Sequence, residues 1–293
     1  MQTYTLTDMH IHGGYGIDLM TADSGDIIRL SQKLKDGNVG MWTPTLIGDT
    51  LPVLCERVKA IADAAKDCPE IVGIHIEGPF ISSKKSGVLP KENIIPCDIK
   101  YFDTLAKYGL PLRFTVAPEC PKAVDFIKYV TESGGTVTLG HSDDDGTMTR
   151  KAIAAGAAGF THLFNAMRSI HHRNGSIAQT ALLSGLPCEI IADKRHLSPD
   201  TVKMIYKTIG LENIVLVTDA MSAMQSSIGE YDFCNKKVYF DGKTVSVGGT
   251  LAGSCLTMQK ALDNFCEITG EDKKTAAEAS LKNSLKLIRS KHK

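Results

Sequence analysis

Two short motifs pair residues that bind metals or transfer protons. The run DMHIHG carries His10 and His12, and the run GIHIEGPF carries His75 and Glu77. Residues two apart in a strand point to the same face of a sheet, so each motif would bring both of its side chains to one border. Burying such groups without partners costs on the order of several kcal/mol. Each pair is therefore either a satisfied polar pair in an ordinary core or part of a site.

The same arrangement, an apolar run that ends in a metal-binding or acid–base residue, recurs along the chain. Four further residues of this kind follow apolar runs: His141, His162, His196 and Asp219. With His10, His12 and His75, the chain has six of its nine histidines at such positions. A single histidine at the end of a strand is usually structural, whereas this many beside Glu77 and Asp219 indicate one shared site.

Imidazole and carboxylate ligands together suit zinc or iron(II), and an open coordination position distinguishes a catalytic site from a structural one. Glu77, His141 and His162 supply three ligands and leave that position free. His10 and His12 would hold a second metal or support the first. A divalent metal lowers the pKa of water towards neutrality and polarises a carbonyl. The predicted reaction class is metal-assisted hydrolysis with one or two metals per subunit, in which Asp219 acts as general base and then as acid.

Strands and helices alternate along most of the sequence, and this order would position those residues. Eight apolar or β-rich runs are expected to be strands: 4–11, 39–46, 71–76, 111–116, 136–139, 159–163, 188–192 and 214–217. Helical periodicity occupies the stretches between them: 24–35, 50–66, 99–108, 121–132, 147–155, 176–184 and 198–209. Ser24, Asp49 and Ser198 are the expected helix caps.

Strands that alternate with helices imply parallel pairing through right-handed crossovers. Eight such units predict a closed (β/α)8 TIM-type barrel, whose active site is built from the carboxyl ends of the strands. A doubly wound open sheet is the alternative, but it calls for a glycine-rich phosphate turn after an early strand, and the sequence has none.

After the eighth strand the pattern changes. A β-hairpin is expected within about 229–250, with Asp241-Gly242 as its turn, and helices are expected over about 256–267 and 272–288. No linker or repeat divides the chain, so residues 1–293 are predicted to form a single hydrolase barrel domain with this hairpin insertion and these C-terminal helices.

Charge and composition exclude several classes of partner. Lysine plus arginine equals aspartate plus glutamate at 33 each, and the basic residues are scattered, so neither nucleic acid nor an anionic membrane is expected as a partner. No apolar run approaches the ~20 residues of a membrane span, and the opening residues do not resemble a signal peptide. The eight cysteines have no metal-type or disulfide-type spacing. They are expected to be reduced thiols in a cytoplasmic protein.

The motifs taken together resemble the amidohydrolase superfamily and, within it, the N-acetylglucosamine-6-phosphate deacetylase family. The matching segments stand in family order over almost the whole chain: DMHIHG (8–13), GIHIEGPF (73–80), VAPE (116–119), LGHS (139–142), THLFNAM (161–167), HHRNG (171–175), IADKRHLSP (191–199), LVTDAMSA (216–223) and GTLAGSCLTM (249–258). HxH alone would be weak, but HxEGPF, HLFNAM and LVTDA in combination are specific. The resemblance implies hydrolysis of the N-acetyl group of an amino sugar phosphate.

Residue by residue, the resemblance implies a metal centre. Glu77, His141 and His162 match the ligands of the main metal. His10 and His12 fit the second site of members that bind two metals.

The resemblance also implies a substrate site. Asp219 matches the family's catalytic acid–base, and Asn165 and Ala166 match residues on the phosphate side of the substrate. His196 matches a substrate-binding histidine. Arg173 matches an arginine that reaches the phosphate across a dimer interface, so a homodimer is expected; its planar fork suits phosphate.

Three departures from the family pattern concern substrate identity and fold. The HxH begins at residue 10 and the sequence ends at 293, so the small β-sandwich domain of family members is expected to be largely missing. Family members usually read KGAH after HIEGPF, with a histidine that touches the substrate, whereas Leu89 stands there in this chain. The usual Asp-Gly before the histidine of the seventh strand is Asp193-Lys194.

Two other functions remain open at this point. A related amidohydrolase acting on a different N-acetyl or amide substrate would account for Leu89. A non-catalytic barrel that binds an amino sugar phosphate would account for the missing β-sandwich. It would bind ligand without turnover, and the intact metal set argues against it.

Overall fold

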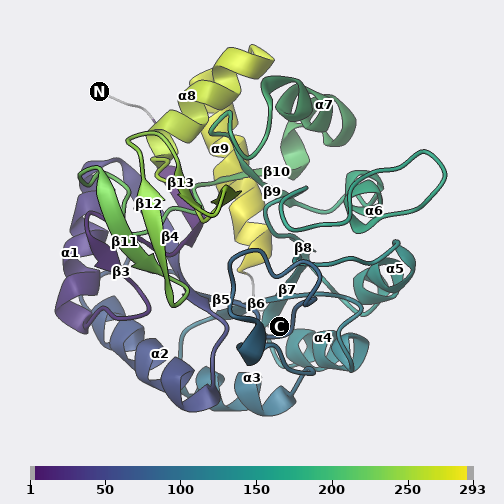
Figure 1. Cartoon of the computed structure of the whole chain (residues 1–293), viewed down its shortest axis with the longest axis horizontal. Coiled ribbons are helices and arrows are strands. Elements are labelled where there is room, and N and C mark those ends of the chain that lie inside the picture. The colour runs from purple at the N-terminus through teal and green to yellow at the C-terminus, as the bar shows by residue number, and fades with distance from the viewer. Residues whose placement is uncertain (1–3, 289–293) are drawn as a thin grey trace.

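A closed barrel of eight parallel strands forms the body of the protein (Figure 1). The structure is a computed structural model that describes residues 4–288. The barrel strands, in their order around the sheet, are β1 (Leu6–Ile11), β4 (Val39–Ile47), β5 (Ile74–Glu77), β6 (Leu112–Val116), β7 (Thr136–Leu139), β8 (Gly159–Phe160), β9 (Cys188–Ile191) and β10 (Ile214–Val217). The ends of β1 and β10 meet through the main chain, where Asp219 N donates to His10 O at 2.8 Å and His12 N to Ala220 O at 2.7 Å. The predicted (β/α)8 barrel is therefore confirmed, and the open doubly wound alternative is wrong.

Helices surround the barrel on its outside (Figure 1). They are α1 (Ser24–Asp36), α2 (Leu51–Ala65), α3 (Ile99–Leu105), α4 (Ala123–Glu132), α5 (Thr147–Ala154), α6 (Ile177–Leu183), α7 (Pro199–Ile209), α8 (Met258–Thr269) and α9 (Lys273–Ser284). Short 3-10 helices occupy η1 (Lys91–Asn93), η2 (Ala106–Tyr108), η3 (Leu211–Asn213) and η4 (Leu285–Leu287).

The helix starts confirm one predicted cap and correct two. Ser198 caps α7 through its side chain, as predicted, and Pro199 follows at the first helical position. The cap of α1 is Asp23 rather than Ser24, because Asp23 and Asp26 form a reciprocal capping box. The cap position of α2 is Thr50 rather than Asp49, and the Thr50 side chain makes no capping bond.

The inside of the barrel is unusually polar. Barrels of this type are usually filled by Val, Ile and Leu. Here the buried interior includes His75, Arg113, Thr115, Thr161 and Glu189. Hydrogen bonds link these groups, for example between the hydroxyls of Thr115 and Thr161 at 2.7 Å, although Nε of Arg113 has no partner among the described residues. Buried polar groups need such partners, so this layer forms a fixed polar support beneath the rim.

A four-stranded antiparallel sheet follows β10 in the chain (Figure 1). It consists of β11 (Gly229–Phe233), β12 (Lys236–Phe240), β13 (Val245–Val247) and β14 (Thr250–Leu251). The predicted hairpin is its central pair, β12 and β13. A second hairpin joins β11 to β12 through Cys234 and Asn235, both with positive φ, as a tight two-residue turn requires.

A separate apolar cluster fastens this sheet to the barrel rim. Phe233 and Val238 from the sheet pack in one cluster with Val88 and Leu89 from the loop after β5. Lys236 Nζ also donates to Val88 O at 2.9 Å. The sheet and the loop therefore form one continuous cover beside the carboxyl ends of the strands. The remaining strands outside the barrel among residues 4–288 are the short pair β2 (Gly13–Gly14) and β3 (Ile17–Asp18).

Helix α9 packs against the seam between the first and last barrel strands. Asn283 Nδ2 donates to Ile214 O at 2.8 Å, and Ser280 Oγ accepts from Leu216 N at 3.0 Å. Thr7 and Ser284 share a hydrogen bond of 3.1 Å. Helices α8 and α9 lie where the two C-terminal helices were predicted, but α9 ends at Ser284 and the 3-10 turn η4 continues only to Leu287. None of the helices in the described part of the chain is both long and apolar enough to cross a membrane.

Candidate metal centre

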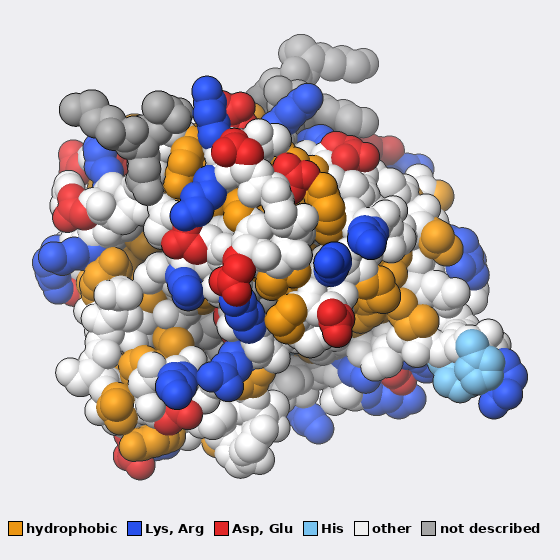
Figure 2. Space-filling model, turned by 90° about the horizontal axis from the view of Figure 1, so that it is seen from above, with side chains coloured by type: hydrophobic (Ala, Val, Ile, Leu, Met, Phe, Trp, Pro, Cys, Tyr) orange, Lys and Arg blue, Asp and Glu red, His pale blue; other side chains and the backbone are white. Residues whose placement is uncertain are grey.

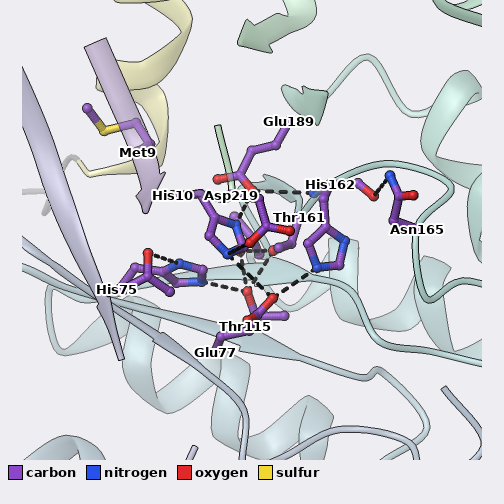
Figure 3. A network of polar contacts seen from close by, with 12 residues as sticks. Met9, His10, His75, Glu77, Thr115, Thr161, His162, Asn165, Glu189 and Asp219 are labelled. Carbon is purple, nitrogen blue, oxygen red and sulfur yellow. Dashed lines mark hydrogen bonds and ion pairs between the residues drawn. The ribbon is translucent and has the colours of Figure 1, made fainter. Parts of the chain in front are cut away.

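The carboxylate of Glu77 lies among four histidines at the carboxyl ends of the strands, and Figure 3 shows it beside two of them, His10 and His162. The carboxylate of Glu77 lies 3.5 Å from Nε2 of His10, 3.2 Å from Nε2 of His12, 3.1 Å from Nε2 of His141 and 2.9 Å from Nε2 of His162. The ligand atoms form two groups able to hold a metal ion, and Glu77 belongs to both. The structure thus brings together all five residues that the sequence predicted as metal ligands.

Asp219 completes this cluster. Its Oδ1 lies 3.4 Å from His10 Nε2 and 3.3 Å from His12 Nε2. The carboxylate is therefore beside the candidate metal groups, where a reacting molecule would be held. This is the position expected of a residue that transfers protons.

Three of these residues occupy the left-handed region of the backbone. His141, His162 and Asp219 follow β7, β8 and β10 closely and have φ values of 47°, 29° and 50°. Side chains other than glycine rarely adopt this region, at a cost of roughly 1–3 kcal/mol each. The turns direct the three side chains into the mouth of the barrel instead of along the strand. Strain of this kind is concentrated at functional sites.

In each metal group, one histidine is oriented by a hydrogen bond to Nδ1, the ring nitrogen that does not face Glu77. His10 Nδ1 lies 3.1 Å from Glu189 Oε2, and His141 Nδ1 lies 2.8 Å from the main-chain oxygen of Lys85. With Nδ1 held in this way, Nε2 of each ring faces Glu77, as in histidines that bind metals. Among the described residues, Nδ1 of His12 and of His162 has no hydrogen-bond partner.

The buried carboxylates and histidines of the site shift one another's pKa values. Burial would raise the pKa of Glu77, but the neighbouring histidines, His10 foremost, hold that pKa well below its usual range. Burial would also raise the pKa of Asp219. The nearby His10 and His12 outweigh the effect of burial, so the pKa of Asp219 is lowered as well. In return, and against the effect of burial, hydrogen bonds to Asp219 and Glu77 raise the pKa of His12 to about 9.

This donor set fits a divalent metal. Without a cation, the buried carboxylates keep protons on His10 and His12, and a metal ion would replace those protons. Imidazole and carboxylate ligands in groups of three are those that zinc and iron(II) accept. The residues present therefore fit the metal that the motif predicts.

His75 belongs to the polar support and to neither metal group. Its Nδ1 lies 3.1 Å from Thr45 Oγ1, and its Nε2 lies 2.7 Å from Thr115 Oγ1. Burial, with the nearby charge of Arg113, holds its pKa well below the usual value, so the ring is neutral. The two side chains of GIHIEGPF thus differ: Glu77 reaches the metal groups, and His75 packs in the layer below.

A cavity of about 420 Å³ opens above the cluster. Glu77, His141, His162 and Asp219 lie at its base. Its walls include the residues predicted to contact substrate, Asn165, Ala166 and His196, together with Lys85, Leu89, Phe233 and Leu251. The cavity is therefore lined by both polar and apolar side chains, and Leu89 and Phe233 among the apolar ones belong to one packed cluster.

Comparison with known proteins identifies the family. No family model matches the chain. The N-acetylglucosamine-6-phosphate deacetylase of Bacillus subtilis is 34% identical over 274 residues, which cover 90% of this chain and 69% of that protein. The chain belongs to the N-acetylglucosamine-6-phosphate deacetylase family.

Two further relatives of this deacetylase family bear on the site. An N-acetylgalactosamine-6-phosphate deacetylase from Escherichia coli is 33% identical over 271 residues, covering 90% of this chain and 71% of that protein. A solved structure of an N-acetyl-D-glucosamine-6-phosphate deacetylase variant from Mycobacterium smegmatis, in complex with N-acetyl-D-glucosamine-6-phosphate, has a TM-score of 0.91. It is 26% identical to this chain and covers 97% of it, while this chain covers 77% of that structure.

Arg173 is the predicted substrate-binding residue that does not line the cavity of its own chain. It is exposed in the segment between β8 and α6, next to His171 and His172. Exposed imidazoles, which among the described residues are those two, project at one edge of the molecule (Figure 2). On the same face, acidic and basic side chains are intermixed, without one large field of either sign.

Several residues of the candidate site were not predicted from the sequence. Glu189 and Arg113 lie inside runs that were predicted to be buried strands. A charged residue in such a run could have indicated a role in the site. Lys85 contributes its main-chain oxygen, which no side-chain pattern can indicate. Phe233 reaches the cavity from the distant four-stranded sheet, and its ring lies 5.3 Å from that of His12.

Proposed function

We propose that the protein catalyses metal-dependent hydrolysis of the N-acetyl group of N-acetylglucosamine 6-phosphate, giving glucosamine 6-phosphate and acetate. One observation carries this proposal above the others. In a chain of this family, the Glu77 carboxylate lies within 3.5 Å of Nε2 of four histidines, with Asp219 beside them at the base of a cavity.

The five residues His10, His12, Glu77, His141 and His162 would hold one or two divalent metals, zinc or iron(II). Bound there, a metal supplies polarisation of the acetyl carbonyl and lowers the pKa of water. Asp219 has a lowered pKa, so it is ionised at neutral pH and accepts the proton of the attacking water. It then passes this proton to the departing nitrogen, so that water and amide become acetate and amine.

The polar residues that line the cavity would bind the sugar phosphate. Asn165 and Ala166 follow His162 in a turn, where Asn165 N donates to His162 O at 2.9 Å. His196 lines the same cavity. Its ring is oriented by Asp193, whose Oδ2 lies 2.7 Å from His196 Nδ1. An imidazole held in this way can present its other nitrogen to an anionic group.

The pH dependence of substrate binding tests the role of His196. Burial lowers and Asp193 raises the pKa of His196, and Asp193 prevails, so the ring is charged below this raised pKa and neutral above it. An anionic substrate therefore binds more weakly as the pH rises through that value. We expect KM to increase with pH over this range, and the increase to disappear in His196→Gln, as measured by steady-state kinetics. The same KM profile in both proteins would contradict this role.

We further propose that the enzyme is a homodimer in which the partner subunit's Arg173 reaches the phosphate. The exposed position of Arg173, outside its own cavity, supports a contribution in trans. Guanidinium groups bind phosphate through two parallel hydrogen bonds, which suits this role.

Mixing two weakly active variants tests that arrangement. Arg173→Ala and Asp219→Asn subunits, each weakly active alone, form hybrid dimers in which one site has both residues intact. After subunit exchange at equal amounts, we expect activity to recover to about a quarter of wild type, because half of the dimers carry one good site. Mixtures that stay as inactive as the separate variants would show that Arg173 does not act in trans.

Acetate release from a matched set of compounds tests the proposed function itself. The set comprises N-acetylglucosamine 6-phosphate, N-acetylglucosamine and N-acetylgalactosamine 6-phosphate, each offered to metal-loaded protein. We expect rapid release from the first and a large loss without the phosphate. Binding without any release would favour the non-catalytic alternative, and release from other N-acetyl compounds only would favour a different amidohydrolase.

N-acetylgalactosamine 6-phosphate is the second candidate substrate. Relatives named for its deacetylation are as similar to this chain, at 33% and 35% identity, as those named for the glucosamine compound. The ratio of kcat/KM for the two sugars in the same assay decides between them.

We propose that the protein is cytoplasmic, because its cysteines form no disulfides. All eight are free thiols, which is usual where the cell keeps thiols reduced. Cell fractionation tests this, and recovery of the protein in an oxidising compartment would contradict it.

A further inference from the structure

A buried carboxylate outside the ligand set contacts one histidine of each candidate metal group. Glu189 lies on β9 and is fully buried. Its Oε2 lies 3.1 Å from His10 Nδ1 and accepts from the main-chain N–H of His162 at 3.3 Å (Figure 3). His10 belongs to one metal group and His162 to the other. One side chain therefore reaches both groups from below.

Arg113 holds this carboxylate in place. It is also buried, and its guanidinium pairs with Glu189 through Nη1. Its Nη2 donates to the main-chain oxygen of Met9, the residue before His10. The two arms of the guanidinium thus join Glu189 to the strand that carries His10. A buried carboxylate without such a partner would tend to take up a proton.

We infer that Glu189 is a positioning residue that fixes the ring of His10 and the turn at His162, so that the two metal groups share one support. The inference rests on the proposed metal centre but not on the identity of the substrate. An acceptor at Nδ1 keeps the proton on that nitrogen and leaves Nε2 free for a metal. At His162, the hydrogen bond to the main chain stabilises a backbone with a φ of 29°.

The support of His141 is different in kind. Its Nδ1 lies 2.8 Å from the main-chain oxygen of Lys85, in the loop after β5. That oxygen is neutral, whereas the carboxylate beneath His10 is charged. Loss of the Glu189 charge should therefore weaken the His10–His12 group more than the His141–His162 group.

Cobalt(II) titration of Glu189→Gln tests the inference. Cobalt(II) is a probe whose visible absorption reports the ligands around each ion, independently of activity. We expect the affinity for cobalt(II) to fall by about 10- to 100-fold, the usual effect of removing a residue that hydrogen-bonds to a metal ligand. We also expect the absorption band of the weaker group to change. Asp144→Asn is the matched control, because Asp144 is also a buried carboxylate. It accepts from Gly146 N and Thr149 N and bonds to neither the side chain nor the main chain of a candidate ligand, so cobalt binding should stay as in wild type.

A double variant separates positioning from charge imbalance. Glu189→Gln alone leaves Arg113 buried without its anionic partner, which by itself destabilises the protein. Glu189→Gln with Arg113→Met removes both charges and carries the test if the single variant does not fold. Weak cobalt binding in the folded double variant supports the inference. Wild-type binding in either variant overturns it, and a wild-type protein that binds no cobalt overturns the proposed metal centre together with it.

Discussion

Asp219→Asn is expected to lower kcat by about 10²- to 10⁴-fold, the range that a general acid–base group contributes. Asparagine keeps the shape of the side chain but cannot accept the proton of the attacking water. The carboxylate is well placed for this step, because it lies beside His10 and His12 and its lowered pKa keeps it ionised at neutral pH. KM should change little, and metal should remain with Glu77, His141 and His162. Steady-state kinetics and elemental analysis of the same preparation measure both effects.

Asp144→Asn is the matched control for this substitution. Asp144 is buried and lies beyond the same rim, but it stabilises the start of α5 by accepting from Gly146 N at 2.8 Å and Thr149 N at 2.9 Å. Its replacement should cost about 0.5–2 kcal/mol of stability, as for the loss of a helix cap, and leave kcat unchanged. If Asp219→Asn kept a kcat close to that of wild type, Asp219 would not be the acid–base group.

Glu77→Gln is expected to remove metal from both groups at once. Glu77 is the ligand that the two groups share, with oxygens 3.1 Å from His141 Nε2 and 3.2 Å from His12 Nε2. A neutral amide cannot offset the charge of a divalent ion in a buried site. We expect metal affinity to fall by at least about 100-fold, more than the loss of a partner outside the ligand set usually costs. Acetate release should fall in parallel, and elemental analysis after dialysis gives the metal content.

Glu119→Gln provides the comparison for Glu77. Glu119 lies at the same rim and accepts from Ser142 Oγ and Asp143 N, each at 2.7 Å, but it belongs to neither metal group. This variant should keep its metal and its activity. A Glu77→Gln protein with a full complement of metal would contradict the shared-ligand arrangement.

The barrel and its rim residues were predictable because both follow from local pattern. Alternating strands and helices specify a parallel barrel, and the carboxyl ends of parallel strands meet at one edge. His141 and Asp219, which are 78 positions apart in sequence, could therefore be placed in one site from the strand ends alone. The metal ligands could be predicted without knowing the turns that orient them.

Contacts between distant elements were not predictable in the same way. Nothing in the sequence pairs Arg113 with Glu189, because strands that are not neighbours in the barrel meet only across its interior. The contact of Phe233 with His12 depends on how the four-stranded sheet folds over the rim. The predicted helix caps were wrong where two neighbouring residues could serve as the cap, as at Ser24. There the reciprocal hydrogen bonds of Asp23 and Asp26 make Asp23 the cap.

Anomalous diffraction at the absorption edge of the bound metal tests the central claim most directly. Crystals of metal-loaded, active protein should show a peak within bonding distance of Glu77, His141 and His162. A second peak at His10 and His12 would establish two metals per subunit, and its absence would establish one. Active crystals without a peak beside Glu77 would contradict the proposed metal centre.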